Sequence, residues 1–139
     1  MPTYRRATVQ DIPRVMEIRF AVQENRLHDP TSVTPADCEA FIARGLIWVA
    51  EEQGRVIGFS AGNDRDGTIW ALFVDPVAQG RGLGADLLAL ACRDLAAKGY
   101  ATARLTTDPG TRADRFYRRN GWMDRGLDAT GAVRFERPL

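Results

Sequence analysis

Residues 74–88 read Val-Asp-Pro-Val-Ala-Gln-Gly-Arg-Gly-Leu-Gly-Ala-Asp-Leu-Leu, which predicts the end of an apolar strand, a glycine-rich turn and the start of an amphipathic helix. Glycines at 80, 82 and 84 carry no Cβ that would keep an anion away from the backbone, and they permit positive φ. The N–H groups of residues 80–85 then converge at a helix N-terminus, whose unpaired donors and dipole favour phosphate. We therefore expect a phosphorylated ligand at this turn, and a pyrophosphate fits it best.

The composition is that of one ordinary domain, which we expect to span residues 1–139 and to need neither disulfides nor metals. Nineteen basic side chains against eighteen acidic ones argue against a surface for nucleic acid. One segment is nevertheless rich in arginine, at positions 112, 115, 118 and 119. Two interpretations of it stay open: a solvated helix face, or an edge that faces phosphate, which arginine binds through two parallel hydrogen bonds.

The cysteines and the N-terminal residues indicate a cytoplasmic protein. Cys38 and Cys92 both fall in predicted helices, and two cysteines make no disulfide framework, so a reducing compartment is the simplest expectation. Residues 1–6 contain no apolar signal region, and no apolar run approaches the length of a membrane span. We expect no contact with a membrane.

The rest of the chain alternates between strand and helix patterns. Strands are predicted over residues 4–8, 46–50, 56–61, 68–74, 101–107, 122–127 and 132–136. Helices are predicted over residues 12–22, 34–45, 83–98 and 111–120. Residues 23–33 are polar and lack a period, which indicates a loop. Residues 68–107 then form a strand-helix-strand unit whose two strands pair in parallel.

Two interpretations of the glycine turn compete. Gly80, Gly82 and Ala85 satisfy the G-x-G-x-x-G/A dinucleotide pattern, and Asp108 follows the next strand, near where a ribose-binding acid is expected. A doubly wound sheet, however, needs several strand-helix-strand units. Only one is predicted here, after two helices and an antiparallel meander, so a dinucleotide fold accounts for less of the chain than the alternative.

The alternative is a resemblance to the GCN5-related N-acetyltransferases, the GNAT family. Residues 79–84, Gln-Gly-Arg-Gly-Leu-Gly, resemble that family's acetyl-coenzyme A loop, Gln/Arg-x-x-Gly-x-Gly/Ala. Residues 113–122, Ala-Asp-Arg-Phe-Tyr-Arg-Arg-Asn-Gly-Trp, resemble its A-x-x-F-Y-x-x-x-G-F segment, and the two motifs occur in the family's order. The resemblance implies an α/β (α+β) GNAT fold. Its mixed, mostly antiparallel sheet would have about seven strands and about four helices, with a splayed parallel pair at the cofactor site.

The resemblance implies acetyl-CoA as the cofactor and no metal. The pyrophosphate would lie at the helix start, with Arg81 closing over it, and the pantetheine would pair with backbone near Phe73 and Val74. A backbone N–H at about Leu72 or Phe73 would polarise the thioester carbonyl. The implied cofactor-binding residues are Leu72, Phe73, Val74, Gln79, Gly80, Arg81, Gly82, Leu83, Gly84, Ala85, Thr107, Phe116 and Tyr117.

Tyr117 matches the family's tyrosine that protonates the departing thiolate. A phenol suits this role because its basicity is close to that of the thiolate; simple packing beside Phe116 is the alternative interpretation. The base that accepts the proton of the amine stays open. Candidates are Glu17, Glu24, Asp75 and His28, and desolvation of the amine alone could suffice.

The sequence departs from the family pattern at two positions. Gly110 stands where the family often has an Asn that helps to hold the cofactor, so a backbone group or Thr111 would have to substitute. Trp122 replaces the usual final Phe and preserves an aromatic contact. The first departure keeps open a different class of function, a module that binds acyl-CoA without turnover.

The acceptor implied by the resemblance is a primary amine of a small molecule, peptide or protein. The family places acceptor-binding groups between its first two helices, so we expect Asn25, Arg26, Asp29 and Trp70 to line this site. Family members are frequently dimers, and the last two predicted strands could pair across a two-fold axis to form a homodimer.

Overall fold

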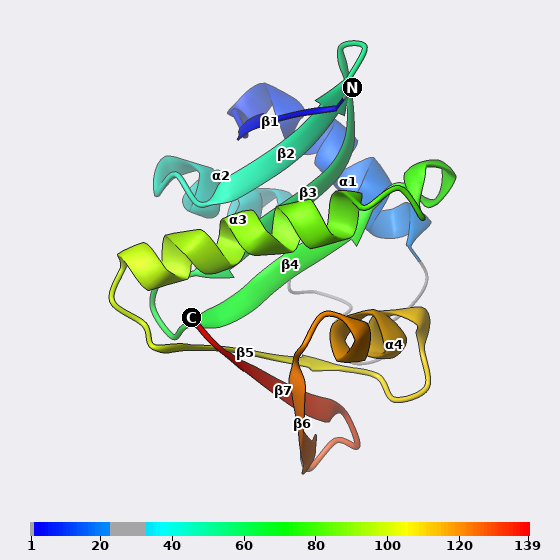
Figure 1. Ribbon diagram of the computed structural model, residues 1–139. Coiled ribbons are helices and arrows are strands. Elements are labelled where there is room, and N and C mark those ends of the chain that lie inside the picture. The colour runs from blue at the N-terminus through cyan, green and yellow to red at the C-terminus, as the bar shows by residue number, and fades with distance from the viewer. Residues whose placement is uncertain (1, 23–32) are drawn as a thin grey trace.

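The computed structural model describes residues 2–22 and 33–139 (Figure 1). Its strands are β1 (Thr3–Arg6), β2 (Ile47–Glu52), β3 (Arg55–Asn63), β4 (Thr68–Val74), β5 (Thr102–Thr107), β6 (Met123–Leu127) and β7 (Val133–Pro138). Its helices are α1 (Ile12–Ala21), α2 (Pro35–Ala43), α3 (Leu83–Ala97) and α4 (Arg112–Arg119), with short 3-10 turns η1 (Val9–Asp11) and η2 (Pro76–Ala78). The elements follow one another in the predicted order.

The seven strands form one sheet in the order β1-β2-β3-β4-β5-β7-β6. All neighbouring strands are antiparallel except β4 and β5, which are parallel. Helix α3 crosses one face of β3 and β4, and α1 and α2 lie behind them on the opposite face (Figure 1). This arrangement confirms the predicted mixed, mostly antiparallel sheet with four helices and one parallel pair.

Strand β4 contains a bulge before it reaches the glycine turn. Ala71 lies opposite Ala61 on β3, but Ile69 lies opposite Gly62, so Trp70 is an extra residue on β4. A bulge bends its strand, increases the local twist and turns a side chain in a new direction. Along β4 and β5, both described in full, only Thr68 and Arg104 align as a parallel pair. The two strands therefore separate towards their C-terminal ends.

Helix α3 is held against the sheet by one apolar face. Leu83, Leu87, Leu88, Ala91 and Leu95 are all buried, at the spacing of one side of a helix. Because this face packs on the sheet, the N-terminus of α3 is fixed at the C-terminal end of β4.

Local signals placed most boundaries to within two residues: β2, β3 and β7 each extend two residues beyond their predicted ends, and the first strand ends two residues early. The strand predicted over residues 4–8 ends at Arg6. The cause is Thr8, which forms a capping box with Asp11 and so belongs to the start of η1 rather than to a strand. In the β2–β3 hairpin, Gln53 and Gly54 both have positive φ, as expected for a two-residue turn. In the part of the chain that the structure describes, no helix is long and apolar enough to cross a membrane.

Candidate active site between β4 and β5

The glycine turn leads directly into the N-terminus of α3. Gly80 and Gly82 have φ of +82° and +83°, and a Cβ on either would meet no atom within 4 Å. Gly82 is the N-cap of α3. Within the described residues no acceptor takes the N–H groups of residues 80–85. The turn therefore presents open backbone donors at a helix N-terminus, which is the arrangement that binds phosphate.

A cavity of about 330 Å³ lies beside this turn, between the end of β4 and helix α4. Ten of the predicted cofactor-binding residues line it: Leu72, Phe73, Val74, Gln79, Gly80, Gly82, Gly84, Ala85, Phe116 and Tyr117. The Gln79 side chain donates to the carbonyl of Val74 at 3.4 Å and so ties the turn to β4. The structure thus brings most of the predicted set into one cavity.

The arginine-rich segment divides into two pairs. Arg112 and Arg119 line the cavity at the glycine turn. Arg118 instead pairs with Asp114 and Asp124, and Arg115 donates to the carbonyl of Gly110 at 3.0 Å. Arg112 and Arg119 therefore fit the interpretation of an edge that faces phosphate. Arg115 and Arg118 instead stabilise the local structure.

Three predicted cofactor-binding residues lie elsewhere. The side chain of Leu83 is buried in the core beneath α3, so only its backbone faces the turn. The guanidinium of Arg81 pairs with Glu52 at 2.5 Å, and it would have to leave this partner to close over a pyrophosphate. Thr107 lines a second, larger cavity.

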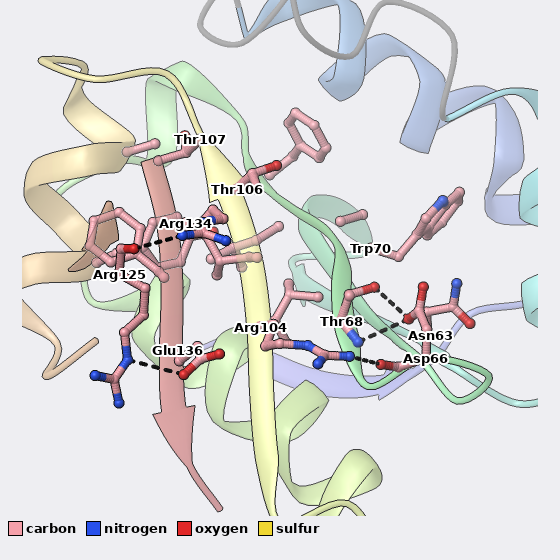
Figure 2. A pocket seen from close by; sticks show the side chains of 18 of the residues that line it. Asn63, Asp66, Thr68, Trp70, Arg104, Thr106, Thr107, Arg125, Arg134 and Glu136 are labelled. Carbon is pink, nitrogen blue, oxygen red and sulfur yellow. Dashed lines mark hydrogen bonds and ion pairs between the residues drawn. The ribbon is translucent and has the colours of Figure 1, made fainter. Parts of the chain in front are cut away.

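This larger cavity has a volume of about 950 Å³, and residues of β4, β5 and β7 line it (Figure 2). Trp70, one of the residues expected at the acceptor site, lines this cavity, and its ring stacks on Phe41 with centroids 4.0 Å apart. The other expected acceptor residues, Asn25, Arg26 and Asp29, lie outside the described residues. Seven polar residues that the sequence did not single out for this site also line the cavity: Asn63, Asp66, Arg104, Thr106, Arg125, Arg134 and Glu136.

The two cavities adjoin at a boundary, here called the passage, whose residues line both of them. Both are lined by Val22, Leu72, Phe73, Ala113 and Tyr117. The Tyr117 side chain is 7% exposed, and among the described residues its hydroxyl has no hydrogen-bond partner. Burial raises the pKa of this phenol above its ordinary value, and nearby Cys92 adds to the shift. The protonated phenol of Tyr117 therefore lies at the boundary where a ligand in the smaller cavity would meet a ligand in the larger one.

The described candidates for a general base lie away from this passage. Asp75 forms an ion pair with Arg14 and accepts from the N–H of Val77 at 3.2 Å. Glu17 is exposed and lies 3.3 Å from Arg14. Neither lines a cavity, and Glu24 and His28 lie outside the described residues. In residues 2–22 and 33–139, no group of three or more His, Cys, Asp or Glu side chains could hold a metal ion.

The two departures from the family motif have clear local roles. Gly110 has a φ of +75°, and its N–H donates to the Asp114 carboxylate at 2.7 Å. The hydroxyl of Thr111 caps α4 by accepting from the N–H of Asp114, and it donates to the carbonyl of Asp108. Thr111 is therefore already engaged and does not replace the missing Asn. Trp122 is buried and packs against Tyr117, with ring centroids 5.7 Å apart.

Comparison with known proteins points to one family. A family model described as "Acetyltransferase (GNAT) domain" matches residues 43–124. A ycf52-like uncharacterized N-acetyltransferase of Prochlorococcus marinus is 38% identical over 71 residues, or 49% of this chain. The match spans only 38% of the length of that curated relative.

Solved structures share the whole fold. The PaiA N-acetyltransferase of Thermoplasma acidophilum, in complex with coenzyme A, aligns with a TM-score of 0.81 at 16% identity, over 100% of this chain and 99% of that one. The yncA protein of Salmonella typhimurium, with its cofactor acetyl-CoA, aligns with a TM-score of 0.80 at 19% identity, over 100% and 94%. At these identities the likeness concerns the fold, and it agrees with the splayed sheet described above.

Proposed function

Since the chain belongs to the acetyltransferase (GNAT) domain family, we propose that it transfers the acetyl group of acetyl-CoA to a primary amine by direct attack of the amine on the thioester. We take residues 1–139 as a single acetyltransferase domain. The observation that carries the proposal is the passage at Tyr117, where the cavity beside the glycine turn adjoins a second, larger cavity.

The residues at the smaller cavity fit coenzyme A. The open N–H groups of residues 80–85 suit a pyrophosphate, and Arg112 and Arg119 add positive charge beside them. β4 pairs with β3 along its length, but its edge towards β5 has no strand partner beyond Thr68, so the backbone on that edge is available to the amide groups of pantetheine. Since Phe73 and Val74 line this cavity, a chain laid along β4 would lead from the turn to the passage. The two solved structures named above hold coenzyme A or acetyl-CoA, which supports the same assignment.

Tyr117 is proposed as the general acid. Acetyl-CoA supplies an activated acyl group, and transfer forms an amide C–N bond while the thioester C–S bond breaks. The departing sulfur needs a proton, which the Tyr117 hydroxyl is proposed to donate; burial raises the pKa of this phenol, so it holds its proton until the thiolate forms. The proton lost by the amine goes to solvent or to a base for which the described residues offer no candidate at the passage. A backbone N–H near Leu72 or Phe73 is proposed to polarise the carbonyl.

The acceptor, the cellular compartment and the oligomeric state are also proposals. The acceptor is a small-molecule or peptide amine in the larger cavity, and no nucleic acid takes part. Cys38 and Cys92 are free thiols, which agrees with a reducing compartment such as the cytoplasm. A homodimer through the β6 edge remains a prediction.

One observation favours a second function. Gly110 contributes no side chain, and the Thr111 hydroxyl is engaged in capping α4, so the side chain that often holds the cofactor in this family has no side-chain replacement at these two positions. A module that binds acyl-CoA without turnover is therefore the alternative.

Release of free CoA thiol from acetyl-CoA, measured with and without a panel of primary amines, separates the two functions. The proposed enzyme releases thiol in proportion to acetylated amine. Saturable binding of acetyl-CoA without amine-dependent release would favour the binding module, and failure to bind any CoA species would exclude both.

A further inference from the structure

Arg14 of α1 forms a largely buried ion pair at the point where β4 leads into the glycine turn. Its Nη2 donates to Oδ2 of Asp75, the first residue after β4, and its Nε donates to the carbonyl of Val56 on β3 at 2.8 Å. The side chains of the pair are 19% and 12% exposed. The guanidinium is therefore fixed to the sheet by one contact and holds the carboxylate by the other.

Asp75 connects this ion pair to the residues that precede the glycines. Its Oδ1 accepts from the N–H of Val77 at 3.2 Å, and its carbonyl accepts from the N–H of Ala78 at 2.8 Å. Val77 and Ala78 are the last two residues of η2. Ala78 is also buried in the same apolar cluster as Leu83, the first residue of α3. Asp75 therefore holds η2 in place, and the end of η2 sets where the glycine turn begins.

The glycine turn depends on the anchors at its two ends. Gly80 and Gly82 have positive φ, and a Cβ on either would meet no atom within 4 Å. Glycines leave a backbone many conformations, so the direction of the N–H groups between the anchors is not fixed by the turn residues themselves. The buried side chain of Leu83 is the anchor on the α3 side. On the β4 side the anchor is η2, which the Asp75 carboxylate caps.

Resting on the proposed function, we infer that Arg14 is a positioning residue for the pyrophosphate. Through the Asp75 carboxylate it holds the N–H groups of the glycine turn in the arrangement that binds the anion, although Arg14 itself lines neither cavity. Without the guanidinium, the carboxylate loses the cation that offsets the cost of its burial, so it turns towards solvent and releases the N–H of Val77. The turn is then no longer ordered before the ligand arrives, and binding must supply the free energy of ordering it.

The N-terminal part of the chain offers a matched ion pair. Arg5 donates to both oxygens of the Asp11 carboxylate, at 2.8 and 3.0 Å, and these side chains are 38% and 10% exposed. Asp11 also accepts from the N–H of Thr8 at 2.7 Å, at the start of η1. Neither member of this pair lines a cavity. Arg14→Met and Arg5→Met thus each remove an arginine from a buried aspartate at a 3-10 turn, but Arg5 lies away from the glycine turn.

Two acetyl donors test the inference: acetyl-CoA, and S-acetylpantetheine, which lacks the pyrophosphate. In Arg14→Met, kcat/KM for acetyl-CoA should fall about tenfold through KM, the usual effect of losing one hydrogen bond to a charged group. For S-acetylpantetheine, kcat/KM should stay within about twofold, because this donor does not use the turn. Arg5→Met should lower the melting temperature as Arg14→Met does and change neither value.

Calorimetry with acetyl-CoA and a double-mutant cycle test whether Arg14 acts through Asp75. Arg14→Met and Asp75→Asn should each weaken binding of acetyl-CoA about tenfold, and the double variant should bind no more weakly than either single variant. Asparagine has one oxygen where two donors, from Arg14 and Val77, need an acceptor. Asp75→Asn changes the side-chain volume little, so it also keeps the test available if Arg14→Met does not fold.

Four results would overturn the inference: wild-type affinity for acetyl-CoA in Arg14→Met, an equal loss of kcat/KM for both donors, an equal loss of affinity in Arg5→Met, or additive losses in the double variant. Binding of acetyl-CoA without amine-dependent release of thiol would overturn the proposed acetyl transfer alone, because the calorimetric test needs no turnover. Wild-type protein that binds no acetyl-CoA would overturn both.

Discussion

Thr68 of β4 lies opposite Arg104 of β5, and it is the one parallel pair along these two strands, both of which are described in full. The N–H of Arg104 donates to the carbonyl of Gly67 at 3.2 Å, and its guanidinium donates to the carbonyl of Asp66. These contacts hold β4 and β5 together at one end, and the strands separate from there. Beyond them β4 contains the bulge at Trp70, and its residues Leu72 and Phe73 line both cavities. The same arginine thus closes the splay and lines the proposed acceptor cavity.

Replacement of Tyr117 by Phe should lower kcat by about ten- to a thousandfold, the usual range for loss of a proton donor, with little change in KM for acetyl-CoA. Because burial raises the pKa of the phenol, the wild-type rate should not fall as pH rises through about 10, where an ordinary tyrosine loses its proton. Steady-state kinetics across the pH range measures both effects.

The control for this variant is Tyr100→Phe. The Tyr100 hydroxyl donates to the carbonyl of Asp64 at 2.8 Å and lines neither cavity, so its loss should cost about 1 kcal/mol of stability and leave kcat within about twofold. Wild-type turnover by Tyr117→Phe at every pH would show that Tyr117 only packs against its aromatic neighbours.

Gly82→Ala should weaken binding of acetyl-CoA about tenfold or more. Alanine at a φ of +83° costs roughly 1–2 kcal/mol, and the backbone can relieve this strain only by moving the N–H groups of the turn. Gly45→Ala is the matched variant, because Gly45 has a φ of +69° and equally open surroundings but lies after α2, away from both cavities. Calorimetry should show weaker binding of acetyl-CoA in Gly82→Ala than in Gly45→Ala, although the melting temperatures of the two variants should fall by similar amounts. Equal affinity in both would mean that the turn does not hold the cofactor.

Arg119→Gln should raise KM for acetyl-CoA roughly tenfold, since Arg119 lines the smaller cavity and pairs with no carboxylate among residues 2–22 and 33–139. Added salt should reduce the difference in KM for acetyl-CoA between Arg119→Gln and wild type, because salt screens the charge of an exposed guanidinium. Arg115→Gln on the same helix should leave KM unchanged, since Arg115 lies outside both cavities. An equal effect of the two substitutions would indicate a general loss of positive charge instead of a local contact.

Cys38 should make the protein less stable in alkali. Burial raises the pKa of this thiol to about 11 from 9.0, and the charge of Asp37 adds to the shift. A raised folded-state pKa means that the stabilisation is complete below about pH 9 and is lost as pH rises through about 11. Between these values Cys38→Ala should lose less free energy of unfolding than wild type, by on the order of 1–2 kcal/mol. Urea titrations at about pH 9 and about pH 11 measure this difference. If wild type and Cys38→Ala lost the same free energy of unfolding between these two pH values, the Cys38 thiol would not be the cause.

Local sequence signals accounted for the elements around the glycine turn. The apolar run of β4, the turn glycines and the leucine spacing of α3 each depend on neighbouring residues, so their limits were predictable to within a residue or so. The capping residues Thr34 and Thr111 likewise mark the starts of α2 and α4.

The polar lining of the larger cavity was not predictable in this way. It depends on the register of β5 with β7, which sets Thr106 opposite Arg134, and no local signal in either strand reveals that pairing. The alternation of Ala103 and Leu105 with Arg104 and Thr106 was the available hint, because it shows which side chains leave the core. The role of Asp75 was hidden for a similar reason, since its partner Arg14 is 61 residues away.

The most direct test of the account is a crystal structure of the protein with acetyl-CoA or an analogue that cannot be cleaved. The account predicts the pyrophosphate on the N–H groups of residues 80–85 and the thioester sulfur within hydrogen-bonding distance of the Tyr117 hydroxyl. A thioester located outside the passage where the two cavities adjoin would contradict it.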